Sequence, residues 1–276
     1  MLEMGLTEWS VLLSLMFALG AGAGFLAGLL GIGGGIVLVP GLYYLFKHLG
    51  FDGDVLMHMS VGTSLAVIIP TGFISARAHI KKGAVRIDLV KRIGAGIIIG
   101  VGAGTLIADY ISGDSLKLVF ACTLILFAGL MQIDPQKFRL RNDVPSRPWT
   151  ELAGVIVGTL STLMGVGGAT LNVPFLTLHG VPIHTAVGTS SAIGPLIAIP
   201  GAIGFIVIGW NQSGLPPLSL GYVNLLAMLA IVPFSMLAAP WGVRAAHGVS
   251  VVTLRQIFSA FIVIVAARML YSALAE

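Results

Sequence analysis

The sequence contains little charge for its length. Asp, Glu, Lys and Arg make up only 9% of its 276 residues, whereas 57% are hydrophobic and the mean hydropathy is +1.00. Soluble domains carry about 25% charged residues, so this composition excludes a water-soluble enzyme or binding module. Apolar runs approaching the ~20 residues that span a bilayer recur along the whole chain. The composition therefore predicts a single membrane domain built from helices.

Cysteine and acidic residues are also scarce. Cys122 is the only cysteine, so the chain cannot form an intramolecular disulfide. The eleven acidic residues all fall at the termini, in loops or at the ends of predicted spans. Transporters that bind cations or relay protons usually keep a carboxylate inside a span, and metalloproteases need a motif such as H-E-x-x-H. The sequence therefore predicts neither an enzyme nor a bound metal or cofactor.

The Lys and Arg residues lie mainly in loops between apolar runs, which argues against nucleic-acid binding. Cytoplasmic loops of membrane proteins are enriched in these two residues. The loop at 79–92 (HIKKGAVRIDLVKR) is strongly basic, whereas its counterpart at 211–222 (NQSGLPPLSLGY) carries no charge. We therefore expect these loops to face opposite sides of the membrane, with both chain termini outside.

A polar linker at 134–151 divides the chain into two halves. It contains DPQKFRLRNDVPSRPW, whose four basic residues and three prolines are typical of a surface connection. We expect an N-terminal membrane repeat at 1–133, a cytoplasmic linker, and a C-terminal membrane repeat at 152–276. Each half holds five apolar segments, at 9–30, 35–49, 58–79, 92–111 and 115–133, and at 152–166, 169–179, 185–210, 222–243 and 256–274.

Two motifs recur in the same order in both halves. GLLGIGGGIVLVPGL begins at Gly28 and TLMGVGGATLNVPFL begins at Thr162, so their glycine clusters and Val-Pro steps align 134 positions apart. A VGTS motif then follows in each half, at 61–64 and 187–190. An odd number of segments per half inverts the second copy, which is a common construction of secondary transporters. We therefore predict an all-α integral membrane protein with two inverted-topology repeats.

The second segment of each half, 35–49 and 169–179, is too short for a comfortable span. We expect each to be a half-helix that follows a break at GIGGG or GVGG. Broken backbone at membrane depth is tolerated only where it is buried in protein or lines a cavity. The alternative is that these glycines only let helices pack closely. Each repeat would then contain a broken or re-entrant glycine-rich hairpin plus three transmembrane helices.

The expected binding site combines the breaks with the VGTS motifs. At the start of a helix, hydroxyls and free backbone N–H groups favour an anion, and two such sites near the midplane would form a cage. Asn172 adds an amide where the first half has Leu38. Ordinary capping or interhelical hydrogen bonds are the competing explanation for the hydroxyls. The candidate substrate ligands are Gly33, Gly34, Gly35, Thr63, Ser64, Gly167, Gly168, Asn172, Thr189 and Ser190.

Four further residues are candidates for coupling or for anion entry. His58 and His184 each precede a VGTS glycine by four positions, and they either couple transport to protons or mark the start of a helix. Arg77 and His79 end the third segment, where they either snorkel to the cytoplasmic surface or draw anions to the inner mouth.

The paired glycine motifs, the VGTS motifs, RAHIKKGAVRIDL at 77–89 and GLPPLSLGYVNL at 214–225 resemble the sulfite exporter TauE/SafE family, also called the 4-toluene sulfonate uptake permease family. The resemblance covers essentially the whole chain, although Ala169 replaces the usual third glycine of the second cluster. It implies a secondary transporter of sulfur-containing anions, such as sulfite or sulfoacetate-like organosulfonates, in the bacterial inner membrane.

The expected partners are therefore the lipid bilayer, a small anionic substrate and, in one interpretation, a coupling proton or ion. An anion channel of the same architecture and a non-transporting accessory subunit are the alternative functions. The sequence indicates neither the direction of transport nor an oligomeric state.

Overall fold

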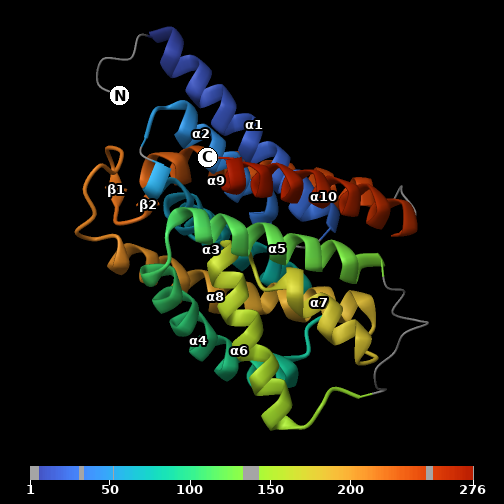
Figure 1. Ribbon diagram of the computed structural model, residues 1–276. Helices are drawn as coiled ribbons and strands as arrows, with labels where there is room; N and C mark the ends of the chain where they lie inside the picture. Colours follow the sequence, from blue (N-terminus) through green and yellow to red (C-terminus); the bar gives the residue numbers. More distant parts are fainter. Residues whose placement is uncertain (1–5, 31–33, 52, 133–142, 247–250, 276) are drawn as a thin grey trace.

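The computed structural model describes residues 6–30, 34–51, 53–132, 143–246 and 251–275, and these residues are mostly α-helical (Figure 1). A helix is present for each of the ten predicted segments. The helices are α1 (Leu6–Leu30), α2 (Gly35–His48), α3 (Gly53–Lys81), α4 (Ile87–Tyr110), α5 (Gly113–Gln132), α6 (Arg147–Met164), α7 (Ala169–Leu178), α8 (Ile183–Ile208), α9 (Leu225–Ala246) and α10 (Val251–Ala275).

Six of the described helices are long and apolar enough to cross a membrane, namely α1, α3, α4, α5, α8 and α9. The chain is therefore a multi-pass membrane protein. By contrast, α2 has 14 residues and α7 has 10. At 1.5 Å per residue these helices are about 21 Å and about 15 Å long, less than the ~30 Å hydrocarbon core. The prediction that the second segment of each half is a short helix is confirmed.

Several helix boundaries differ from the prediction. α3 begins at Gly53 and α6 at Arg147, five residues before the predicted starts in both cases. Ser146 and the Pro that follows Arg147 start α6 early, because proline fits the first turn of a helix. Between α8 and α9, a short hairpin of β1 (Ser219–Leu220) and β2 (Val223–Asn224) interrupts the all-α architecture.

Two long helix pairs pack along rows of glycine. α1 lies along α9, and α4 lies along α6. A Cβ atom added at Gly24 of α1 would overlap the backbone of Ser235 in α9. Small residues allow such close backbone approach where water provides no hydrophobic driving force. Both pairs are parallel: Gly20, Gly24 and Gly28 face Ile231, Ser235 and Ala239, while Gly96, Gly100 and Gly104 face Glu151, Val155 and Thr159.

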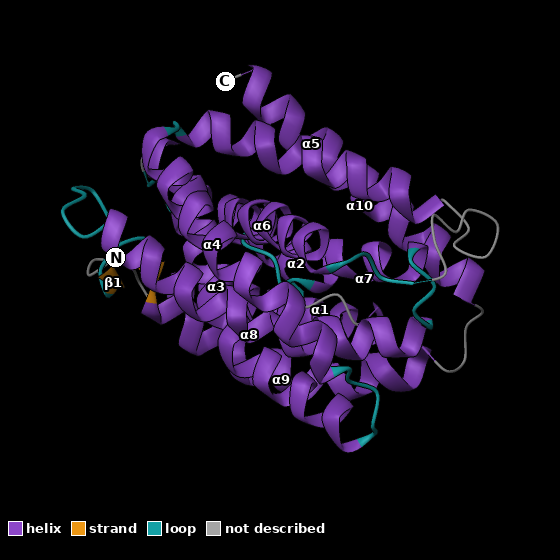
Figure 2. Ribbon diagram, turned by 90° about the horizontal axis from the view of Figure 1, so that it is seen from below, coloured by secondary structure: helices purple, strands orange, loops and turns teal. Residues whose placement is uncertain are grey.

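The corresponding helices of the two halves pack against each other in opposite directions. In the centre, Gly62 of α3 faces Phe205 of α8, whereas Gly72 of α3 faces Pro195, so the two helices are antiparallel. α5 and α10 lie side by side at one edge of the molecule (Figure 2). Gln132, the last residue of α5, donates a 3.0 Å hydrogen bond to Ser259, near the start of α10.

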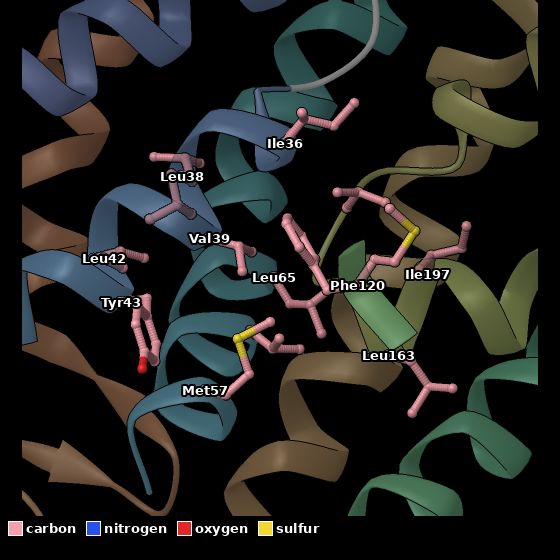
Figure 3. Packing of buried hydrophobic residues seen from close by; sticks show 14 of the residues in the cluster. Ile36, Leu38, Val39, Leu42, Tyr43, Met57, Leu65, Phe120, Leu163 and Ile197 are labelled. Atoms are coloured by element: carbon pink, nitrogen blue, oxygen red, sulfur yellow. The ribbon is translucent and has the colours of Figure 1, made fainter. Parts of the chain in front are cut away.

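The core lies between these packed helices and is apolar. Figure 3 shows Val39 of α2, Leu65 of α3, Phe120 of α5 and Ile197 of α8 converging on one region. Each of these side chains is fully buried. Helices from both halves therefore contribute to one continuous cluster.

Replacing Gly24 by alanine should destabilise the protein, because the added methyl group overlaps the Ser235 carbonyl. We expect a loss of about 1–3 kcal/mol, seen as a lower melting temperature in detergent. Gly22→Ala is the matched control, since a Cβ atom at Gly22 meets no atom within 4 Å. The control should unfold at or above the parent temperature, because alanine favours a helix more than glycine does. Equal melting of the two variants would contradict the packing argument.

Candidate functional site

The two glycine-rich breaks touch each other. Gly34 precedes α2 with φ of 58°, and Gly165 follows α6 with φ of 63°, a left-handed conformation that favours glycine. A Cβ atom at Gly35 would lie 2.6 Å from the carbonyl oxygen of Gly165 and 2.8 Å from Cα of Val166. The breaks of both halves therefore meet inside the protein. Gly33 lies outside the described residues.

The break between α6 and α7 contains glycines that are buried in the protein. Thr162 and Ser161 carbonyl oxygens accept hydrogen bonds from the N–H groups of Gly165 and Val166, which ends α6. Gly168 then packs on α8, where a Cβ atom would come within 2.7 Å of Ile197. All of 161–170 is buried. This break is therefore enclosed by protein, as irregular backbone at membrane depth requires.

The VGTS motif of the first half receives a backbone segment from the second half. The N–H of Asn224 donates a 3.0 Å hydrogen bond to Thr63 Oγ1. A Cβ atom at the neighbouring Gly62 would lie 2.8 Å from the carbonyl oxygen of Tyr222. Glycine thus makes room for the segment before α9, and threonine binds it.

The second VGTS motif does the same with a segment of the first half. The N–H of Arg86 donates a 3.1 Å hydrogen bond to Thr189 Oγ1. A Cβ atom at Gly188 would overlap the carbonyl oxygen of Ala84. The segment before α4 is therefore bound to α8 in the way that the segment before α9 is bound to α3.

VGTS lies further into its helix than the sequence predicted, beyond the first turn in both halves. Thr63 is the eleventh residue of α3, and Thr189 is the seventh of α8. Most backbone N–H groups beyond the first turn are used within the helix, so VGTS offers no helix N-terminus to an anion. In the first half the reason is that α3 begins at Gly53, so that residues 53–57, which the sequence analysis placed before the third segment, form its first turns. Whether the two threonine hydroxyls also contact substrate stays a prediction.

The two VGTS serines differ from each other. Ser64 Oγ donates a 2.7 Å hydrogen bond to the carbonyl oxygen of Gly165 and so ties α3 to the break of the other half. Ser190 is equally buried, but among the described residues its hydroxyl has no hydrogen-bond partner. Ser190 is therefore available to a ligand in a way that Ser64 is not.

Five buried side chains around the break between α6 and α7 have polar atoms without a hydrogen-bond partner in the described part of the chain. A buried polar group left unpaired costs about 1–3 kcal/mol, so each needs an explanation such as a ligand or water. We call these residues the polar cluster, and each is 0% exposed. They are Ser161, Thr162, Thr170, Asn172 and Ser190.

The packing of α7 against α8 places Asn172 and Ser190 at similar heights along the two helices. Gly168 contacts Ile193 and Ile197 of α8, and Asn172 lies one turn further along α7. α7 returns into α8 through a loop of four residues, 179–182, so the two helices run in opposite directions. Moving one turn along α7 from Gly168 reaches Asn172. The matching move along α8 runs from Ile193 and Ile197 back towards Ser190.

The polar cluster belongs to one half only. At the separation of 134 positions, its first four members correspond to Ala27, Gly28, Ile36 and Leu38. Ile36 and Leu38 are part of the apolar core in Figure 3. Sequence analysis selected Asn172 and Ser190 but missed Ser161, Thr162 and Thr170. Alignment of the two repeats could have revealed these three residues, because each is polar where the first half has a non-polar residue.

The cluster consists of neutral side chains that can donate and accept hydrogen bonds, since Asn172 Oδ1 is also without a partner in the described part of the chain. Each hydroxyl supplies one O–H and the Asn172 amide supplies two N–H groups, and no cluster member is charged. An oxyanion accepts hydrogen bonds from O–H and N–H groups, and the cluster contains no carboxylate that would balance the charge of a cation. The cluster therefore suits a small anion.

The two candidate histidines occupy different environments. His58 is buried, donates from Nε2 to the carbonyl oxygen of Ala108 at 2.8 Å, and stacks on the ring of Tyr222 at 5.0 Å. Burial raises the pKa of the Tyr222 phenol above its usual value. His184 is exposed in the first turn of α8. The repeat therefore does not preserve the role of these histidines.

The remaining candidates lie at the end of α3. Arg77 is exposed and His79 is partly buried. Neither belongs to the polar cluster, so a role for them in entry stays a prediction.

Thr63→Val should lower the melting temperature, because it leaves the buried N–H of Asn224 without its acceptor. We expect a cost of about 1–3 kcal/mol, which Thr63→Ser should largely avoid by keeping the hydroxyl. Thr71→Val is the control, since Thr71 bonds only to carbonyl oxygens of its own helix. If Thr63→Val melted at the same temperature as the parent protein, the hydrogen bond to the segment before α9 would have no structural role.

Comparisons with known proteins agree with this architecture. A family model described as sulfite exporter TauE/SafE matches residues 16–269. The chain is 36% identical to a probable membrane transporter protein of Haemophilus influenzae, over 92% of this chain and 97% of the relative. It is 30% identical to a probable membrane transporter protein of Methanocaldococcus jannaschii, over 82% and 84% of the two chains. A Bacillus subtilis relative, probable membrane transporter protein YunE, is 28% identical over 93% and 97%. The chain therefore belongs to the sulfite exporter TauE/SafE family of membrane transporters.

Proposed function

We propose that this protein is a secondary transporter of small sulfur-containing anions, such as sulfite or sulfoacetate-like organosulfonates, in the bacterial inner membrane. The observation that carries the proposal is the polar cluster, which is buried and neutral, lies beside a broken helix and has no hydrogen-bond partner for these atoms in the described part of the chain. The name of the family supports the substrate class. Binding at a break between half-helices is typical of transporters that work by alternating access.

We propose further that the two halves are inverted-topology repeats, each with a glycine-rich hairpin and three transmembrane helices. The antiparallel packing of α3 on α8 and of α5 on α10 supports this arrangement. The first helix of each half also packs on the fourth helix of the other half, since α1 packs on α9 and α6 packs on α4, and this arrangement supports the proposal too. The basic loop at 79–92 would then lie inside and both termini outside.

The proposed substrate site combines the polar cluster with the backbone of the breaks. Asn172 and Ser190 supply side-chain donors, and Ser161, Thr162 and Thr170 extend the same surface. The backbone of 33–35 and 167–168 completes the site. Thr63, Ser64 and Thr189 contribute mainly by holding the surrounding segments in place.

Transport can be measured with purified protein in liposomes, using radiolabelled sulfite and sulfoacetate. Asn172→Leu inserts the residue that the first half carries at this position, and Ser190→Ala removes the unpaired hydroxyl. We expect each to lower the initial rate about tenfold or more, since a hydrogen bond to a charged group contributes about 1.5–3 kcal/mol. Both variants should remain folded, because neither side chain has a partner among the described residues.

Ser191→Ala is the matched control, because Ser191 is adjacent and buried but bonds to the carbonyl oxygen of Val187 at 2.9 Å. It should transport at the parent rate. Saturation and counterflow would identify a carrier, whereas flux without them would identify a channel. Active parent protein with unaffected Asn172→Leu and Ser190→Ala variants would overturn the site, and liposomes without anion flux would overturn the function.

A further inference from the structure

A lysine side chain is buried where α2, α5 and α10 meet. Lys117 is the fifth residue of α5 and is 2% exposed. Its ammonium group lies 2.7 Å from Asp114 Oδ1 and donates a 3.0 Å hydrogen bond to Tyr43 Oη of α2. The Tyr43 hydroxyl lies 3.4 Å from Ser272 Oγ of α10. An ionisable group inside a membrane helix is costly and is usually functional.

The ammonium group of Lys117 has more N–H donors than acceptors among the described residues. It has three N–H donors, and within the described residues only Asp114 and Tyr43 accept from it. The two partners differ in burial: Tyr43 is 1% exposed, but the Asp114 side chain is 58% exposed. The carboxylate can therefore move into water, whereas the ammonium and the phenol stay in the protein.

A second cation lies near this junction. The guanidinium of Arg268 in α10 lies 5.5 Å from the ring of Tyr44, and this ring packs edge-on against Tyr43 at 5.3 Å. Among the described residues, Lys117 and Arg268 thus both approach the tyrosine pair, and Asp114 pairs with Lys117. Lys117 also lies near the N-terminus of α5, whose dipole disfavours a cation and favours an anion.

We propose that this junction is a second oxyanion-binding site, in which the ammonium of Lys117 and the hydroxyls of Tyr43 and Ser272 bind a sulfite or sulfonate group that displaces Asp114. The site is distinct from the polar cluster. Tyr43 lies eight residues along α2 from Gly35, which is about 12 Å of helix. The second site would bind the anion at the end of the bundle where α5 begins. Its ligand class rests on the proposed function, but anion binding there can be measured without transport.

The competing explanation is a purely structural ion pair that ties α2 to α5 and α10. The two explanations predict opposite effects of neutralising the carboxylate. A displaceable Asp114 competes with the ligand, so Asp114→Asn should strengthen anion binding. A structural Asp114 only positions Lys117, so its loss should leave binding unchanged or weaker.

The test measures the dissociation constant for sodium sulfite and for sodium methanesulfonate in detergent, with sodium chloride at equal ionic strength as the reference salt. The parent for this series is an Asn172→Leu, Ser190→Ala variant, so that the polar cluster contributes little. We expect Asp114→Asn to tighten binding about threefold to tenfold, Lys117→Met to weaken it at least about tenfold, and Lys117→Arg to retain it.

The matched control is Asp88→Asn, because Asp88 is also the second residue of its helix and pairs with a cation, Arg86, that is exposed to water. It should not change binding. Weaker or unchanged binding in Asp114→Asn would overturn the second site, and so would equal binding by the parent and Lys117→Met. If Lys117→Met does not fold, Asp114→Asn and Lys117→Arg still decide the question.

The outcome is separable from that of the proposed function. Liposome flux that requires Asn172, together with no effect of the Lys117 and Asp114 series on binding, would reject the second site alone. Binding that follows the Lys117 series, together with liposomes that move no anion, would reject the transport function alone.

Discussion

The structure depends on backbone segments that approach each other closely at glycine. In a bilayer, burial of apolar side chains gives little driving force between helices, so van der Waals contact must hold them together. Contact at Gly24 joins α1 to α9, and contact between Gly35 and Gly165 joins the two breaks. The same constraint explains Gly62 and Gly188, which admit the carbonyl groups of Tyr222 and Ala84. Glycine therefore serves here mainly as the residue that lets two backbones touch.

The VGTS motif has the same structural role in both halves of the chain. In each half, glycine and threonine bind the segment that precedes the fourth helix of the other half. Only the serines diverge, because Ser64 holds the carbonyl of Gly165 while Ser190 has no described partner. The two VGTS motifs thus share one packing arrangement, and the serine is where their hydrogen bonds differ.

Differences between the two halves define the chemistry. Polar residues surround the break in the second half, whereas Ile36 and Leu38 occupy the equivalent places in the first. A buried cation, Lys117, lies away from both breaks. An anion that reaches the interior would therefore meet donors from the second half and apolar side chains from the first. This asymmetry is consistent with a substrate that combines a charged group with a small organic part.

The sequence by itself determined the class of protein, the ten helices, the short second helix of each half and the family. These features depend on local hydropathy, on segment length and on motifs that recur along the chain. The helix starts at Gly53 and Arg147 were missed, because charged residues such as Asp54 and Glu151 lie near the start of these helices and lower the local hydropathy there. Only the tertiary structure decided which hydroxyls are already bonded and that Lys117 meets Tyr43. It also decided that the hydroxyls of Ser161, Thr162 and Thr170 are buried with no partner among the residues that the structure describes. The reason is physical: a hydrogen bond between residues far apart in sequence depends on how helices pack, and the hydropathy of a segment does not encode that packing.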